Sequence, residues 1–131
     1  AAYERDRTVA SPKCVVEFYG PVDLTDPKAR TMKSVRRFLG AKYRSAPDRF
    51  RVASPMAHVS SQSPPTLILH GSVDDLVPIS QADKLAHALE SAGVPHTFVR
   101  PDGWGHAMDR AAPIFEVCAS AMERFLKQNL R

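Results

Sequence analysis

Two side chains in the second half of this sequence have the types and the spacing of an acid–base pair. Asp74 follows the apolar segment 66–69, and His106 follows a second strand-like segment at 96–99. Loops at the carboxyl ends of strands in open α/β sheets form binding and reaction sites, so such loops can bring a carboxylate to an imidazole. A carboxylate that orients a histidine lets the imidazole take a proton from a hydroxyl group. The pair therefore predicts activation of a hydroxyl nucleophile.

The acid and the histidine each have a competing interpretation. Asp75 is the other carboxylate of the turn, but it would more naturally face solvent or support the turn. Asp74 itself has the alternative of an Asx turn, in which the carboxylate bonds only to nearby backbone. Gly103 and Gly105 let the loop before His106 turn sharply, and the alternative there is an ordinary surface histidine. We predict Asp74 and His106 as the catalytic pair.

The remaining histidines do not form a second site. His70 ends the first apolar strand and is expected to pack, or to bond to backbone, beneath the loop. The others fall at irregular or solvated positions: His58, His87 and His96. A metal site needs three or four converging ligands, and neither HxxxH nor HExxH occurs, so we predict no metal and no cofactor.

No nucleophile is apparent, because the Gly-x-Ser-x-Gly pattern of a nucleophile elbow does not occur. Ser72 follows Gly71, yet its context is Gly-Ser-Val-Asp and lacks the strand–elbow–helix arrangement. Cys118 falls in an apolar helix and is not expected to be reactive. Three serines before the second strand are assigned to a linker: Ser60, Ser61 and Ser63. The predicted pair therefore needs a nucleophile from elsewhere.

The spacing of apolar residues predicts alternating strands and helices. Strands are expected at 13–19, 66–70 and 96–99, and helices at 29–39, from Ser80 to Gly93 and from Pro113 onward. Ser80 and Asp83 resemble an N-cap pair, and Gly40 is expected to stop the first helix. Residues 1–12 are interpreted as a polar connector, and 41–63 as irregular apart from a helical turn near 47–52.

This alternation predicts an α/β fold with parallel strands, flanking helices and right-handed crossovers. Three parallel strands make an incomplete sheet, because one side leaves an apolar edge unpaired. We therefore expect a partner segment that is missing from these residues. The exposed edge favours association, with another chain or with a second copy.

Composition bounds the remaining possibilities. The 131 residues form at most one domain, with 44% hydrophobic and 24% charged residues. No apolar run approaches the roughly 20 residues needed to span a bilayer, and no signal peptide is apparent, so no membrane association is predicted and the compartment is left unassigned. The net charge of +4 is concentrated before residue 53, but no aromatic stacking pattern accompanies it, so nucleic-acid binding is not predicted. Cys14 and Cys118 are expected to be reduced core residues.

The chain resembles the C-terminal half of an α/β-hydrolase, in the acetyl esterase/lipase-like carboxylesterase branch. The resemblance covers nearly all of residues 1–131, as the C-terminal part of one domain, and rests on three stretches: VVEFYGPVDLTD, ASPMAHVSSQSPPTLILHG and DDLVPISQADKLAHALESAGVPHTFVRPDGWGHAM. Its most specific motifs are HGxxDxxVP and the terminal GxGH, in that order and separated by one helix and one strand. The start without a methionine suggests the middle of a longer chain.

The resemblance implies that Asp74 is the acid and His106 the base of a serine-hydrolase triad. It also implies that Leu76 and Val77 lie beside the acyl pocket. Trp104 has two interpretations, at the mouth of that pocket or packed under the last helix. The family's oxyanion-hole HGG segment and nucleophile elbow would lie upstream of residue 1, so this chain alone is expected to be inactive. The implied substrates are short acyl esters, such as acetyl or feruloyl groups on polysaccharide.

Two alternatives remain open at this stage. A serine peptidase of the prolyl-oligopeptidase type has nearly the same acid and histidine loops, although FYGPVDL favours the esterase branch. A catalytically inactive chain that acts by association, with a companion chain or with itself, is the other alternative.

Overall fold

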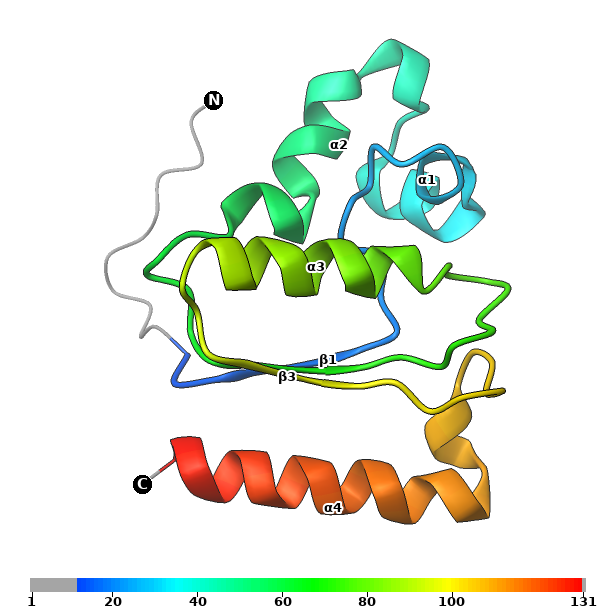
Figure 1. Ribbon diagram of the computed structural model, residues 1–131. Helices are drawn as coiled ribbons and strands as arrows, with labels where there is room; N and C mark the ends of the chain where they lie inside the picture. The colour runs from blue at the N-terminus through cyan, green and yellow to red at the C-terminus, as the bar shows by residue number, and fades with distance from the viewer. Residues whose placement is uncertain (1–11, 131) are drawn as a thin grey trace.

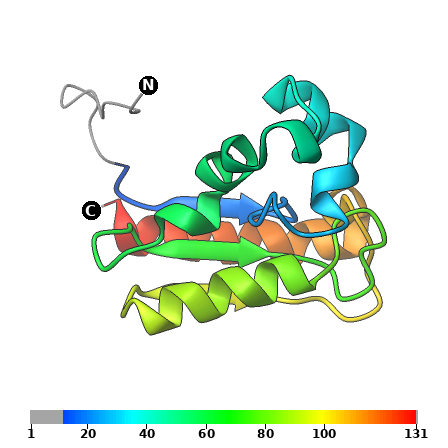
Figure 2. The ribbon, with the colours of Figure 1, turned by 90° about the horizontal axis from the view of Figure 1, so that it is seen from above.

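Three short parallel strands form the centre of the protein. The computed structural model describes residues 12–130. The strands are β1 (Val15–Phe18), β2 (Thr66–Leu69) and β3 (His96–Val99), in the spatial order β1-β2-β3. Their carboxyl ends share one edge of the sheet, because Phe18 pairs with Leu69, which pairs with Val99. Figure 2 shows the strands pointing the same way, toward the loops that carry Asp74 and His106.

Helices cover both faces of this sheet. They are α1 (Lys33–Leu39), α2 (Pro47–Ala53), α3 (Ser80–Ser91) and α4 (Ala112–Asn129), with short 3-10 turns at Ala29–Thr31, Tyr43–Ser45, Pro55–His58 and Met108–Arg110. Figure 1 shows α3 on one face of the sheet and α4 on the other. The predicted α/β fold with parallel strands and flanking helices is therefore confirmed.

The central strand explains why its sequence is continuously apolar. Leu67 and Leu69 pack on the α4 side with Cys118 and Phe125, whereas Ile68 packs on the α3 side. These three β2 side chains are fully buried, because both faces of a strand in such a sheet are covered. Burying each of them stabilises the fold by about 1.5–3 kcal/mol.

A third, separate core lies within the segment that joins β1 to β2. Phe50 of α2 is fully buried there and packs with Val35 and Leu39 of α1 and with Leu24. The segment 41–63, predicted to be mostly irregular, contains α2 and the two 3-10 turns Tyr43–Ser45 and Pro55–His58. It folds as a small helical layer beside β1, as Figure 2 shows.

The first predicted helix is interrupted. Met32 has extended backbone angles, φ −59° and ψ 132°, between the 3-10 turn Ala29–Thr31 and α1. The Thr31 hydroxyl donates a hydrogen bond to the Lys28 carbonyl, and local bonds of this kind compete with helix continuation. The predicted stop at Gly40 is confirmed, because this residue adopts the left-handed conformation that ends α1.

The predicted cap of α3 is wrong. Ser80 is already the first helical residue, Ile79 occupies the capping position, and no side chain caps the helix. Asp83 accepts a hydrogen bond from Arg100 instead. The chain enters the helix one residue earlier because the Pro78 carbonyl already accepts the Gln81 N–H.

Three other expectations concern the N-terminal connector, the cysteines and membrane-spanning helices. The polar connector at 1–12 lies, except for Pro12, outside the described residues. Cys14 is half-buried, Cys118 is buried, and both are free thiols. Within residues 12–130, no helix is long and apolar enough to cross a membrane.

Candidate active site

Asp74 and His106 are in direct contact. Oδ2 of Asp74 lies 2.7 Å from Nδ1 of His106, although the two residues are 32 positions apart. The Asp74 side chain is fully buried, whereas 28% of the His106 side chain is exposed. Because an ionised carboxylate only accepts hydrogen bonds, Nδ1 carries the ring proton and donates a hydrogen bond to Asp74. Nε2 therefore keeps its lone pair and can accept a proton from a hydroxyl group.

Backbone groups hold the second oxygen of Asp74. Oδ1 accepts hydrogen bonds from the N–H of Leu76, at 2.9 Å, and of Val77, at 2.8 Å. The Asx-type turn and the bond to histidine are thus not alternatives, because each uses a different oxygen of the same carboxylate. Asp75 is exposed, as expected from the sequence. Its carbonyl accepts a hydrogen bond from the Lys28 ammonium.

His70 supports the acid from below. Its ring is fully buried, and Nε2 donates a hydrogen bond to the Val77 carbonyl at 2.9 Å. The same nitrogen lies 3.4 Å from Oδ2 of Asp74. The predicted bond from His70 to backbone is confirmed. The sequence did not indicate that this bond closes the loop around Asp74, because the loop's curvature is not encoded in any single residue.

The acid loop (residues 70–78) and the histidine loop (residues 100–107) approach each other closely at Gly71. A Cβ atom at Gly71 would lie 2.1 Å from the Trp104 carbonyl oxygen, so only glycine fits there. Two backbone bonds join the loops beside it: Val73 N–H to Trp104 C=O at 3.1 Å, and Ser72 N–H to Pro101 C=O at 3.0 Å. This contact sets the spacing between the acid and the histidine.

Ser72 joins the same two loops through its side chain. Its hydroxyl donates to Oδ1 of Asp102 at 2.9 Å and accepts from the Gly103 N–H at 2.9 Å. These bonds direct the hydroxyl to the histidine loop's backbone and to Asp102, and no hydrogen bond connects it to His106. The geometry agrees with the sequence-based rejection of Ser72 as nucleophile. No serine, threonine or cysteine in residues 12–130 bonds to Nε2 of His106.

Tyr19 is a residue of this site that the sequence reasoning missed. Its ring packs edge-on against His106, with ring centroids 4.6 Å apart. Its hydroxyl donates to Oδ1 of Asp109 at 2.8 Å. Burial, reinforced by the bond to Asp109, raises the pKa of Tyr19 to about 12, so the ring stays neutral beside the imidazole. Its position just after β1 was the available signal, since strand ends form the site.

Two non-glycine residues of the site have positive φ angles. Tyr19 has φ 37° and Ala107, next to His106, has φ 57°. Such a conformation costs an L-residue about 1–2 kcal/mol, and the surrounding contacts must hold it in place. The strained residues are therefore the one whose ring packs on His106 and the one that follows His106 in the chain.

The three residues predicted beside the substrate have different environments. Leu76 is 48% exposed, Val77 is buried, and Trp104 packs against the core cluster on the α4 side. This packing agrees with one of the two interpretations of Trp104 and does not test the other. Contact of Leu76, Val77 or Trp104 with a substrate stays a prediction. Within the described part of the chain, no cluster of three or more His, Cys, Asp or Glu side chains could hold a metal ion.

Known proteins resemble this chain in sequence. The BD-FAE family model matches residues 2–89, which includes Asp74 and ends before His106. Esterase LipQ of Mycobacterium tuberculosis is 32% identical over 115 residues, which are 83% of this chain and 27% of LipQ. The chain therefore spans about a quarter of this curated relative.

Solved structures resemble it in fold. An acetyl ester-xyloside bifunctional hydrolase from Caldicellulosiruptor lactoaceticus has a TM-score of 0.76 and 26% identity, over 89% of this chain and 42% of that one. A puromycin hydrolase has a TM-score of 0.60 and 27% identity, over 72% of this chain and 15% of that one. The described strands and helices thus correspond to part of an α/β-hydrolase fold.

Proposed function

The chain belongs to the BD-FAE family of α/β-hydrolase esterases, and we propose that it carries the acid and the base of a serine-type carboxylic ester hydrolase. The observation that carries this proposal is the 2.7 Å contact between the buried Asp74 carboxylate and Nδ1 of His106. Such a contact leaves Nε2 as the proton acceptor, which is the arrangement that a serine nucleophile needs.

The proposed reaction has two steps. Nε2 of His106 takes the proton of a serine hydroxyl as the serine oxygen attacks the ester carbonyl carbon, and it then gives that proton to the departing alcohol. Water attacks the acyl-serine in the same way, which releases the acid and restores serine. Asp74 stays ionised and stabilises the imidazolium that forms in each step. Backbone N–H groups outside this chain would stabilise the oxyanion.

The serine would come from a segment beside β1. Of the described strands, β1 lies at one edge of the sheet, and a groove of about 890 Å³ follows it. Val15 and Val16 line this groove, and Val15 is 37% exposed. A strand that pairs with β1 would cover the groove and complete the sheet. We place the nucleophile on that missing half, or on a companion chain that replaces it.

Short acyl esters are the proposed substrates, with acetyl or feruloyl groups on polysaccharide as the leading case. Support comes from the similar hydrolase whose name includes an acetyl ester and a xyloside. A peptidase of the prolyl-oligopeptidase type is the second candidate, because the puromycin hydrolase shares part of this fold at 27% identity. The family match favours the ester.

The test is hydrolysis by the native polypeptide that contains these residues. We expect it to cleave p-nitrophenyl acetate, and we expect His106→Ala to abolish the reaction while His87→Ala, on the exposed side of α3, leaves it unchanged. Folded protein that shows no ester hydrolysis would contradict the proposal, as would equal activity of the His106 variant. Preferential cleavage of a prolyl peptide would establish the second candidate. Comparing the 131-residue chain alone tests whether it is inactive without its companion.

A further inference from the structure

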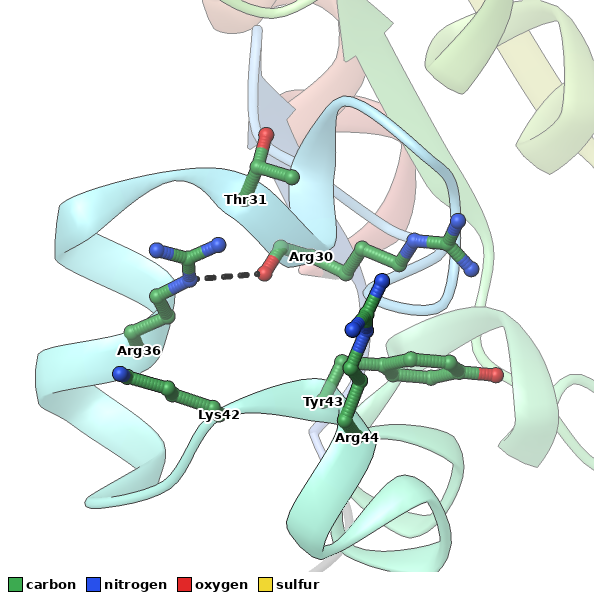
Figure 3. Close-up of a pocket in the computed structure, with 6 residues that line it drawn as sticks. All are labelled: Arg30, Thr31, Arg36, Lys42, Tyr43 and Arg44. Carbon is green, nitrogen blue, oxygen red and sulfur yellow. Dashed lines mark hydrogen bonds between the residues drawn. The ribbon is translucent and has the colours of Figure 1, made fainter.

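A pocket outside the acid–histidine pair is lined by six residues, of which four carry cationic side chains. Its volume is about 680 Å³, and its lining, here called the basic pocket, consists of Arg30, Thr31, Arg36, Lys42, Tyr43 and Arg44. Figure 3 shows Arg30 and Arg44 beside the Tyr43 ring, and Arg36 and Lys42 on the other side of the opening. Four positive charges thus surround one cavity.

Two of the cationic side chains in the basic pocket are held by contacts with the protein, so they are not only solvated. The Arg30 guanidinium lies 4.8 Å from the centre of the Tyr43 ring, and both residues are half-buried. The Tyr43 ring in turn packs edge-on against Phe50, the fully buried centre of the helical core. Arg36 is oriented by a hydrogen bond from its Nε to the Arg30 carbonyl. These contacts hold the Arg30 guanidinium over the Tyr43 ring and the Arg36 side chain beside the Arg30 backbone.

The positive charges of the basic pocket are not neutralised by the described residues. Within residues 12–130, ion pairs involve other cations, such as Lys84 with Asp23 and Asp26. Four like charges around one cavity repel each other, and a bound anion relieves that repulsion. Guanidinium groups match carboxylates with two parallel hydrogen bonds, and three of the four cations are arginines.

The basic pocket is connected to the acid loop. Lys28, directly before the 3-10 turn that carries Arg30 and Thr31, donates a hydrogen bond to the Asp75 carbonyl. Figures 1 and 2 both place α1 toward the carboxyl ends of the strands, where Asp74 and His106 lie. A long substrate with its ester at His106 can therefore extend toward this pocket.

We propose that the basic pocket binds carboxylates of an acidic saccharide, which forms the alcohol part of the ester substrate. Binding of carboxylates follows from the cations themselves, whereas the assignment to a saccharide ester rests on the proposed function. Arg30 and Arg44 would hold one carboxylate beside the Tyr43 ring, and Arg36 and Lys42 a second. A neutral saccharide would gain none of these charge-assisted bonds.

Calorimetry on the native polypeptide tests binding without any catalytic step. Trigalacturonate is the acidic probe, xylotriose the neutral one, and inorganic phosphate tests the other common oxyanion. We expect trigalacturonate to bind and xylotriose not to bind. Replacing two lining residues, Arg36→Gln with Arg44→Gln, should weaken trigalacturonate binding by at least about 10-fold, since charge-assisted bonds are lost. The matched pair Lys33→Gln with Arg37→Gln removes the same charge from exposed positions outside the pocket and should change binding less than about 2-fold.

The outcomes separate this proposal from the proposed function. Equal weakening by both variant pairs would reduce the effect to net charge and overturn the proposal, and so would tighter binding of phosphate than of trigalacturonate. Specific trigalacturonate binding by a protein that cleaves no ester would support the pocket and contradict the proposed function. Ester hydrolysis whose KM is the same for acetylated acidic and neutral saccharides would overturn the pocket's assignment to the substrate.

Discussion

Two largely buried carboxylates belong to neighbouring strands or their loops: Asp74 in the loop that follows β2, and Glu17 within β1. Asp74 has a hydrogen-bond partner on each oxygen: two backbone N–H groups on Oδ1 and the His106 ring on Oδ2. Glu17 accepts one bond from the Gly20 N–H on Oε1, and its Oε2 is buried with no partner among the described residues. The difference lies in how many donors replace the water that burial removes.

The consequence at Glu17 is a shifted titration. Burial raises its pKa from 4.5 to about 7, and the single bond from Gly20 only partly opposes this. Glu17 also lines the groove beside β1, where the proposed companion strand would pair. The β2 end is therefore complete within this chain, whereas the β1 end lacks donors that a companion could supply. We call the bonded pair of Asp74 and His106 the finished half of the site. The edge at β1, where Oε2 of Glu17 has no donor among the described residues, is the unfinished edge.

The largest expected effect is the loss of ester hydrolysis when the finished half is disrupted. Asp74→Asn in the native polypeptide keeps the size of the side chain, but it lets the amide donate to Nδ1 and so stabilises the wrong tautomer of His106. We expect ester hydrolysis to fall by about 10³–10⁴-fold, with kcat carrying the loss. Asp75→Asn is the matched control, because its exposed carboxylate contacts neither histidine, and it should stay near wild type. A small loss at Asp74 would show that the contact with His106 is only structural.

Glu17→Gln tests the unfinished edge by pH. Between pH 4.5 and 7 the folded chain keeps a proton on Glu17 that the unfolded chain has lost, so its free energy of unfolding falls as pH rises. Glutamine removes this titration. The free energy of unfolding of the variant, taken relative to that of wild type, should therefore rise by about 3 kcal/mol between pH 4.5 and pH 7.

Denaturant unfolding of the 131-residue chain across that window measures the effect of Glu17→Gln. Glu116→Gln removes an exposed carboxylate on α4 and should leave the pH dependence as in wild type. A parallel pH dependence of Glu17→Gln and wild type would show that Glu17 is hydrated. If the companion half supplies a donor to Oε2, adding that half should reduce the difference in pH dependence between Glu17→Gln and wild type.

The sequence predicted the finished half better than the unfinished one, for physical reasons. Strand ends and turn residues are local signals, so Asp74 and His106 could be chosen before their 2.7 Å contact was known. The packing of the Tyr19 ring on His106, and the closing of the loop around Asp74 by the His70 bond, depend on how distant segments pack, and no local pattern encodes these contacts. The cap at Ser80 failed because the turn before it had already entered the helix.

Gly71→Ala tests whether the two loops of the finished half need their close approach. The added methyl would lie 2.1 Å from the Trp104 carbonyl oxygen, so one loop must move. We expect a loss of about 2 kcal/mol in the free energy of unfolding and a larger proportional loss of activity, since the acid separates from His106. Gly105→Ala is the control in the same region, because its nearest such neighbour is 3.9 Å away. Equal stability of the two variants would contradict the close approach.

The smallest expected effect concerns Ser72, and it separates two roles for a hydroxyl in the same loop. Its bonds to Asp102 and to the Gly103 N–H join the acid and histidine loops near the surface. Ser72→Ala should therefore lower the free energy of unfolding by about 1 kcal/mol and leave kcat within a few-fold of wild type. Asp102→Ala removes one of the same bonds and should reproduce most of that loss, with little further effect when the two are combined. Abolished hydrolysis in a folded Ser72→Ala protein would instead identify Ser72 as the nucleophile, and the finished half would then be a complete site.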